Sequence, residues 1–229
     1  MPKQKTKSLS LKHTIMSLVI TILLWSAVTN AWGYTKLLGI EDKSFLVHIF
    51  NFVARLVWAS YAIFLLIRYK DDVPTKFKEL YTNVPKLKPF VITVLAVVVY
   101  HICSMFFTHG GLWINPKFNF FKHLFIFAMV AFAEELVYRG WGLNALSKFM
   151  SAKKANFISC LFFVILHLPA YIIQYFLIGT FLYQTIIVQC FMVFILGLVF
   201  GYLYSKGKSL WSCMVVHFLC DFLSVMMIG

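Results

Sequence analysis

Runs of about 20 apolar residues recur along this chain, and a helix of that length spans the hydrocarbon core of a bilayer. The runs lie near residues 14–34, 45–67, 89–108, 121–147, 156–178, 181–204 and 209–228. Backbone N–H and C=O groups in lipid must form hydrogen bonds within the protein, and an α-helix forms them within one segment. These runs therefore predict membrane-spanning helices. Hydrophobic residues make up 61% of the chain, more than one soluble core could bury. We therefore predict an all-α, polytopic membrane protein of about seven transmembrane helices, or eight, in a single membrane domain covering residues 1–229.

The basic residues are distributed unevenly between the predicted loops. With the N-terminus in the cytoplasm, 15 of the 21 basic residues fall in cytoplasmic loops. They are Lys3, Lys5, Lys7, Lys12, Arg68, Lys70, Lys76, Lys78, Lys86, Lys88, Lys148, Lys153, Lys154, Lys206 and Lys208. The positive-inside rule therefore predicts a cytoplasmic N-terminus. The net charge of +13 reflects this bias and contact with anionic membrane lipid, so no nucleic-acid partner is predicted.

A polar stretch from Arg68 to Lys88 interrupts the apolar runs and predicts a cytoplasmic loop. It is too short to form a soluble domain of its own. We divide the chain into N-terminal transmembrane helices with this loop, residues 1–119, and a C-terminal part, residues 120–229.

Ionisable side chains lie inside the apolar runs of the C-terminal part. They are Glu134, Glu135, Arg139, His167, His217 and Asp221. A carboxylate at the bilayer centre costs roughly 2.5–3.5 kcal/mol on insertion scales, so such residues usually have a function. Counted from the nearest inner-loop lysines, Glu134, His167 and Asp221 each lie about 20 Å along their helices, at about 1.5 Å per residue. Three helices are thus predicted to carry polar groups at similar depth, as a buried site requires.

Adjacent carboxylates Glu134 and Glu135 point about 100° apart on a helix, so they cannot have the same role. Glu135 stands four residues before Arg139, the spacing at which a glutamate pairs well with a cation. Glu134 has no such partner in its own helix. A desolvated carboxylate without a cation takes up a proton more readily, which suits a general base. The alternative is that both glutamates belong to an ion-pair cluster that holds helices together.

Two histidines complete the set of candidate residues. His167 precedes Pro169 by two residues, and the proline should open or kink the helix there because it cannot donate to the Ile165 carbonyl. His217 and Asp221 are four residues apart on one helix face, so the aspartate could orient the imidazole or join it in binding a ligand. In isolation, a core histidine and a helix-stabilising polar pair would explain these residues equally well.

The order and spacing of these residues resemble a known family. The pattern consists of Glu134-Glu135-x-x-x-Arg139, Phe163-x-x-x-His167, Phe194-x-x-Gly197-x-x-x-Gly201 and Ser209-Leu210-Trp211 followed by His217-x-x-x-Asp221. It is similar to the CPBP family of intramembrane glutamic or metallo-endopeptidases, which includes the CAAX prenyl proteases and the bacteriocin-processing and immunity proteins called Abi. The resemblance covers about residues 120–228, so residues 120–229 would be the catalytic core.

The resemblance implies a role for each residue. Glu134 and His167 would activate water, Glu135 and Arg139 would form a structural ion pair, and His217 with Asp221 would stabilise the oxyanion. In an older view of the family, Glu134, His167, His217 and Asp221 would bind zinc, a metal that accepts this set of nitrogen and oxygen ligands. The sequence leaves metal-free and zinc-dependent chemistry open. Asp221 departs from the asparagine that is frequent in the family, and an ionised aspartate cannot donate a hydrogen bond to an oxyanion.

Other residues have simpler explanations. Gly197 and Gly201 predict close helix packing. Arg55, in the middle of a predicted span, could contact a substrate carboxylate, face the interior of the bundle or reach toward the interface. The five cysteines all lie in apolar runs without a Cys-x-x-Cys pair, so they read as small hydrophobic residues.

We therefore predict an intramembrane endopeptidase of a bacterial cell membrane. Its substrate would be a membrane-associated peptide or a lipid-anchored protein, and Glu134 and His167 would activate the attacking water. One alternative is a non-catalytic immunity or regulatory scaffold of the same fold. Another is a proton-coupled transporter, because buried acids and histidines also build proton relays.

Overall fold

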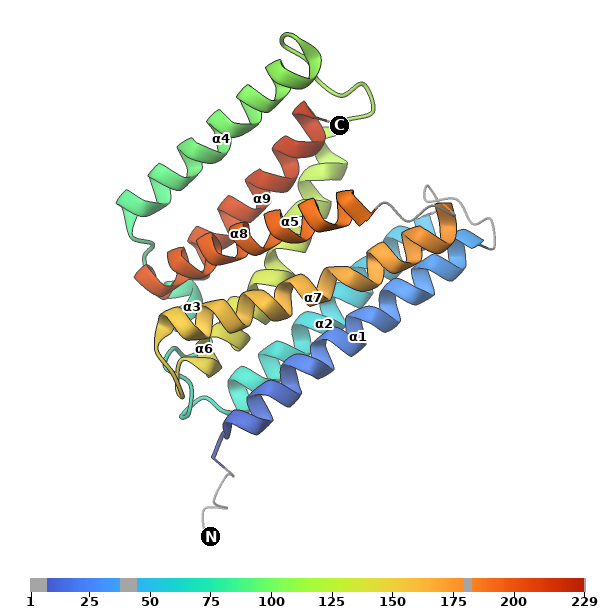
Figure 1. Cartoon of the computed structure of the whole chain (residues 1–229). Helices are drawn as coiled ribbons and strands as arrows, with labels where there is room; N and C mark the ends of the chain where they lie inside the picture. Colours follow the sequence, from blue (N-terminus) through green and yellow to red (C-terminus); the bar gives the residue numbers. More distant parts are fainter. Residues whose placement is uncertain (1–7, 38–44, 179–182, 229) are drawn as a thin grey trace.

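The computed structural model describes residues 8–37, 45–178 and 183–228, and within these ranges every regular element is a helix. The elements are α1 (Leu11–Leu37), α2 (Phe45–Arg68), α3 (Glu79–Thr82), α4 (Leu87–His109), α5 (Phe120–Glu135), the π-helix η1 (Leu136–Leu143), α6 (Asn144–Leu146), α7 (Ala152–Ile178), α8 (Tyr183–Gly207) and α9 (Leu210–Met227) (Figure 1). The predicted all-α membrane fold is confirmed.

In the described part of the chain, six helices are long and apolar enough to cross a membrane: α1, α2, α4, α7, α8 and α9. Each matches a predicted run to within a few residues, and residues 181–182 of the run 181–204 lie outside the described residues. The remaining run, 121–147, corresponds to α5, η1 and α6, which follow one another without a break. α5 has only 16 residues, because the backbone changes to π-helix immediately after Glu135. Length and composition alone therefore identify one spanning helix fewer than the seven predicted.

The π-helix occupies the centre of the bundle. All eight of its residues are buried, and it contacts α1, α2, α7, α8 and α9. Trp141 of η1 donates from its indole nitrogen to Ser17 Oγ of α1 at 2.8 Å, and Ser159 of α7 donates to the Tyr138 carbonyl at 2.7 Å. Irregular helical turns of this type occur frequently at functional sites. Here the turn directly follows the two adjacent glutamates.

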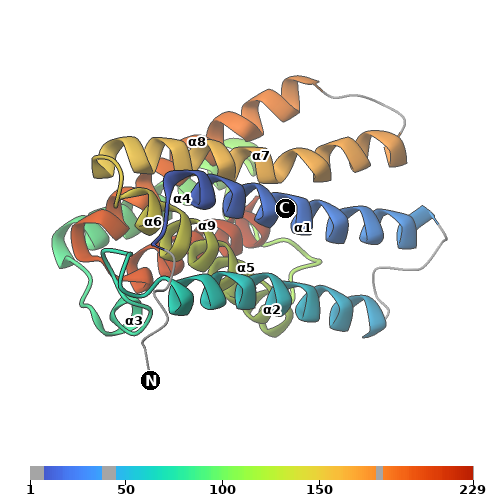
Figure 2. The ribbon, with the colours of Figure 1, turned by 90° about the horizontal axis from the view of Figure 1, so that it is seen from below.

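The long helices pack around this centre. Viewed from below, α1 lies between α7 and α2 (Figure 2), and it contacts both of them. On the other side of the bundle, α4 packs against α9 (Figure 1). Asn144 of α6 accepts from Thr75 N at 3.1 Å and donates to Thr75 O at 2.7 Å, which fixes the loop after α2 to the end of the central helical path.

Small residues allow α7 and α8 to approach closely, as the sequence predicts. A Cβ atom at Gly201 would lie 1.8 Å from Asn156 Oδ1, and one at Gly197 would lie 3.2 Å from Cys160 Sγ. The sequence predicts that α7 opens or kinks at Pro169, and the opening is wrong, because the helix continues through this residue to Ile178. A proline inside a long membrane helix is tolerated where the surrounding protein supports the freed backbone.

Candidate active site

The contact between α5 and α9 brings the predicted polar residues together below the surface of the bundle. Glu134 and Glu135 end α5, whereas His217 and Asp221 lie in the middle of α9. The residue surfaces of Glu134 and His217 are each 6% exposed, and Glu135 is fully buried. Five of the six predicted site residues therefore form one cluster, which is buried except at Asp221: Glu134, Glu135, Arg139, His217 and Asp221.

Glu135 is the connecting residue of this cluster. Its Oε1 atom accepts from Arg139 Nη1 at 2.9 Å and lies 2.8 Å from Nδ1 of His217. Arg139 also donates from Nη2 to the Gly197 carbonyl of α8 at 3.0 Å. The Oε2 atom of Glu135 is buried and has no hydrogen-bond partner among the residues that the structure describes. The spacing predicts the pair with Arg139, and the bond to His217 adds a second role for Glu135.

The other nitrogen of His217 faces two carboxylates. Nε2 lies 3.8 Å from Glu134 Oε2 and 3.6 Å from Asp221 Oδ2. With Nδ1 bonded to Glu135, the imidazole is surrounded by three acidic groups. Glu135, rather than Asp221, thus orients the ring. His217 also gives Glu134 a nearby partner that the spacing within α5 does not reveal.

Asp221 is the most accessible of the acidic groups, with 34% of its side chain exposed. It lies one helical turn beyond His217, at the open side of the cluster. Its distance to Nε2 is beyond a direct hydrogen bond. An intervening water or substrate oxygen could contact both groups.

His167 lies next to the cluster on α7. Its Nδ1 atom bonds the Phe163 carbonyl at 2.8 Å, which requires the proton on Nδ1 and leaves the Nε2 lone pair available in the neutral ring. The Phe163 ring contacts both imidazoles, with centroids 5.0 Å from His167 and 6.1 Å from His217. His167 and Asp221 are close enough to interact electrostatically.

Aromatic side chains enclose the cationic groups. Phe200 of α8 stacks on the His217 ring with a centroid distance of 4.9 Å and an angle of 19°. The Arg139 guanidinium lies 4.5 Å from the Phe163 centroid and 5.3 Å from the Phe200 centroid. These rings cover one side of the cluster and fix the planes of the imidazole and the guanidinium. The sequence motif includes Phe163, whereas Phe200 has no signal in the sequence that distinguishes it from other apolar residues of its helix.

The zinc ligands predicted in the sequence are Glu134, His167, His217 and Asp221. Among the described residues, no three His, Cys, Asp or Glu side chains converge as a metal ion would require. In His217 and in His167, Nδ1 is hydrogen-bonded and Nε2 stays available, which is also the usual arrangement of a metal-bound histidine. Zinc binding stays a prediction, and we derive the chemistry of the site from its side chains.

Arg55 of α2 approaches the same cluster from the N-terminal part of the chain. It is close enough to Glu134 and Asp221 for electrostatic interaction with both. A basic residue in the middle of an apolar run is the signal that draws attention to it in the sequence. Its proximity to the two acids, however, depends on how α2 packs against α5 and η1.

These features define a polytopic helical membrane protein with a buried site of acidic residues and histidines. Residues 116–223 match the family model of the type II CAAX prenyl endopeptidases, described as Rce1-like. This match confirms the resemblance predicted from the motifs, and at family level it supports a CAAX-type intramembrane endopeptidase. The matched segment extends from just before α5 into the last turns of α9 and includes all six candidate residues. Searches among curated proteins and among solved structures found no match.

Proposed function

We propose that this protein hydrolyses a peptide bond in a membrane-associated or lipid-anchored peptide, with Glu134 as the general base. The observation that carries this proposal is the separation of 3.8 Å between Glu134 Oε2 and His217 Nε2. It is too long for a direct hydrogen bond and leaves both groups available to reacting oxygens. Catalytic hydrogen bonds are often long before the substrate binds and shorten in the complex.

In the proposed reaction, Glu134 takes a proton from water while the water oxygen attacks the scissile carbonyl carbon. The Nε2 lone pair of His167 accepts a hydrogen bond from the same water and orients it. The proton held by Glu134 then passes to the leaving nitrogen as the carbon–nitrogen bond breaks. General acid–base catalysis of this kind contributes typically 10²–10⁴-fold to the rate.

His217 would stabilise the negative charge that develops on the carbonyl oxygen. Its Nδ1 is held by Glu135 at 2.8 Å, so the direction of the Nε2 proton is fixed before the substrate arrives. Phe200 stacks on the ring and excludes water from that side. A preorganised cation in a dry site stabilises an oxyanion without reorganising during the reaction.

The direct test is hydrolysis in ¹⁸O-labelled water. Purified protein in lipid nanodiscs is incubated with a library of farnesylated and unmodified peptides, and the products are analysed by mass spectrometry. We expect one ¹⁸O atom in the newly formed carboxyl group of a farnesylated product. The variant His167→Ala should lower the rate about 100-fold or more while it keeps the melting temperature of the wild type. Intact peptides throughout, with folded protein, would overturn the proposal.

A further inference from the structure

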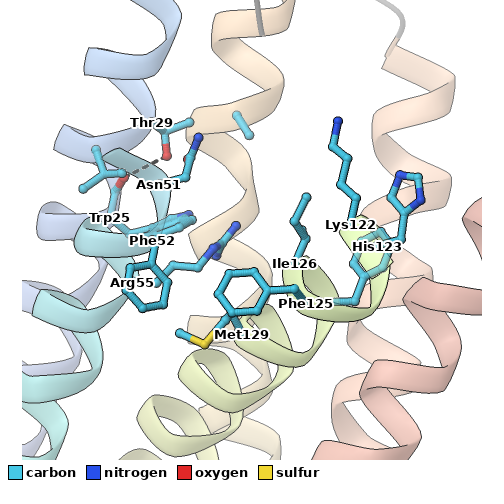
Figure 3. A pocket seen from close by; sticks show the side chains of 13 residues that line it. Trp25, Thr29, Asn51, Phe52, Arg55, Lys122, His123, Phe125, Ile126 and Met129 are labelled. Atoms are coloured by element: carbon cyan, nitrogen blue, oxygen red, sulfur yellow. Dashed lines mark hydrogen bonds between the residues drawn. The ribbon is translucent and has the colours of Figure 1, made fainter. Parts of the chain in front are cut away.

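A pocket of about 590 Å³ lies between α1, α2 and α5, with Ala170 of α7 at its edge (Figure 3). All of its lining residues belong to one half of the bundle. They lie in the second half of α1 and of α7, which end at Leu37 and Ile178. On α2 and on the continuous path of α5, η1 and α6, they lie in the first half, after the starts at Phe45 and Phe120. The pocket has the size of a small-ligand or short-peptide site.

The basic residues predict which side of the membrane this half faces. The opposite ends of the same helices are connected by residues 68–88 and 148–154, which are rich in lysine. The positive-inside rule predicts that these loops are cytoplasmic. The pocket therefore lies in the half of the bundle that faces away from the cytoplasm. We call this the outer half, and the half next to the lysine-rich loops the inner half.

The pocket adjoins the candidate active site. Phe127, in its wall, precedes Glu134 by seven residues, so both lie on one side of α5, about two turns apart. Ala170 follows His167 by three residues on α7, which is about one turn toward the outer end. Arg55 extends from α2 into the pocket (Figure 3) and is in electrostatic reach of Glu134. A ligand in the pocket is thus next to the residues proposed to activate water.

Exposure of the cluster increases toward the outer half. On α9 the side chain of His217 is 7% exposed, whereas that of Asp221, one turn nearer the outer end, is 34% exposed. One turn nearer the inner end, Cys213 is fully buried, and so is Leu210 at the start of the helix. Along this helix, the cluster is therefore open toward the outer half and covered toward the inner half.

The inner half is filled by packed side chains between the cluster and the lysine-rich loops. All eight residues of η1, which continues from Glu135 toward the inner end, are buried. Tyr204 of α8 is also fully buried. Trp211 of α9 donates from its indole nitrogen to the Tyr81 carbonyl at 3.0 Å, which ties the segment around α3 to this end of the bundle. A peptide arriving from the cytoplasm would have to break these contacts before it met Glu134.

We propose that the peptide substrate reaches the active site from the extracytoplasmic half of the membrane, through the pocket between α1, α2 and α5. The inference rests on the proposed function and deepens it, because it specifies an apolar peptide segment that is presented from outside the cytoplasm. The pocket also limits the charge of that segment. Arg55 and Lys122 are basic and none of the lining residues is acidic, so a segment with lysine or arginine in this stretch is repelled.

Access is measured by thiol labelling, which does not depend on cleavage. Ile126 and Met129 of the lining are replaced by cysteine, one at a time, in a variant that lacks the five native cysteines. Spheroplasts and inverted membrane vesicles are treated with the membrane-impermeant anion sulfonatoethyl methanethiosulfonate, and mass spectrometry gives the labelled fraction. We expect Ile126→Cys and Met129→Cys to be labelled in spheroplasts and to lose this labelling in inverted vesicles.

Three controls make the result specific. Ala128→Cys, between the two positions on α5, is exposed on the bundle surface but does not line the pocket. It should stay unlabelled from either side, because lipid excludes the charged reagent. Leu112→Cys and Ser151→Cys, at exposed positions before α5 and before α7, should be labelled from opposite sides, the first in spheroplasts. Melting temperatures show whether each variant is folded.

Labelling of the pocket cysteines from the cytoplasmic side, from both sides alike or from neither would overturn the inference. Labelling of Leu112→Cys only in inverted vesicles would also overturn it, because the outer half would then face the cytoplasm.

Cleavage links the pocket to the substrate. In nanodiscs both membrane faces are open, so peptide hydrolysis there does not depend on the side of entry. We expect labelled Met129→Cys protein to lose the hydrolysis that the same protein shows before labelling, whereas Ala128→Cys treated in the same way keeps its rate. Unchanged hydrolysis by fully labelled Met129→Cys protein would overturn the proposed route. Intact peptide with folded wild-type protein would instead contradict the proposed function.

Discussion

At the scale of single residues, one oxygen atom of Glu135 interacts with two partners. Its Oε1 atom accepts from Arg139 and bonds His217 Nδ1. We predict that Glu135→Gln destabilises the protein by roughly 3 kcal/mol, because it leaves the buried Arg139 cation without its anion. Thermal unfolding in nanodiscs measures this effect.

The same substitution should also lower kcat, since the amide holds the His217 ring in a less defined orientation. A purely structural role would lower the melting temperature and leave kcat of the folded fraction unchanged. Normal stability together with normal kcat would contradict both parts of this prediction.

Asp221 tests whether charge or hydrogen bonding matters at the open side of the cluster. Its carboxylate is 3.6 Å from His217 Nε2, and Glu135 rather than Asp221 orients the ring. We therefore expect Asp221→Asn to keep kcat/KM within about threefold of the wild type, because the amide has the same shape and adds a donor toward the oxyanion. Steady-state kinetics provide the measurement. A folded variant that loses activity tenfold or more would indicate that the negative charge itself is required.

The sequence could predict part of this cluster. The pair of Glu135 with Arg139 follows from a spacing of four residues, which is a local property of a helix. The bond from Glu135 to His217 connects residues 82 positions apart, so it depends on how α5 packs against α9. Arg55 stands out in the sequence because it is a basic residue within an apolar run. Its proximity to Glu134 could not be predicted, because it depends on how α2 packs against α5.

At the scale of elements, the close contact of α7 and α8 depends on Gly201. A Cβ atom there would lie 1.8 Å from Asn156 Oδ1, and Asn156 donates to the Leu198 carbonyl at 2.9 Å. We predict that Gly201→Ala lowers the melting temperature, since Asn156 must give up this hydrogen bond or the helices must separate. Differential scanning fluorimetry of the purified variant measures the change.

Two further variants make this prediction specific. The control Gly111→Ala, at a position with nothing within 4 Å of the added atom, should have little effect. The double variant Gly201→Ala/Asn156→Ala should lose less stability than the sum of the two single variants, because the clash disappears with the asparagine. Additive losses would show that the contact does not limit the packing.

Long helices were predictable because apolar runs and the bilayer thickness determine them. The change from α-helix to π-helix after Glu135 was not, because η1 is a response to packing against five neighbouring helices. Gly140 and Gly142 lie within η1 and are closely surrounded. Glycines also occur in the regular α-helices of this chain, so these two residues do not by themselves predict a π-helix. The continuation of α7 through Pro169 also reflects its surroundings rather than the local preference of proline.

At the scale of the whole molecule, one polar cluster joins three segments that are distant in sequence. Asp72 accepts hydrogen bonds from Lys148 Nζ, from Leu9 N at 3.0 Å and from Ser8 Oγ at 3.1 Å. The hydrogen bond from Lys148, with smaller contributions from Leu9 and Ser8, lowers the pKa of the Asp72 carboxyl below its ordinary value. The folded state therefore favours the ionised carboxylate.

This shift predicts a dependence of stability on pH. The carboxylate should contribute fully above its unfolded pKa of about 3.9 and lose its contribution as the pH falls through the lower folded pKa. Asp72→Asn should lower stability by about 0.5 kcal/mol near neutral pH, since partly exposed ion pairs are screened by solvent. Melting temperatures of both proteins between pH 7 and pH 3 should converge toward the acidic end. A difference that grows as the pH falls would contradict the prediction.

The central claim is that Glu134, and not its neighbour, takes the proton from water. Glu134→Gln preserves the shape of the side chain and removes its basicity, so we expect peptide hydrolysis to fall by at least about 100-fold. Its melting temperature and its binding of the farnesylated peptide should stay those of the wild type. The decisive measurement is the rate of ¹⁸O incorporation into the product by folded Glu134→Gln protein: a rate near background is the predicted result, and a rate equal to that of the wild type would contradict the account.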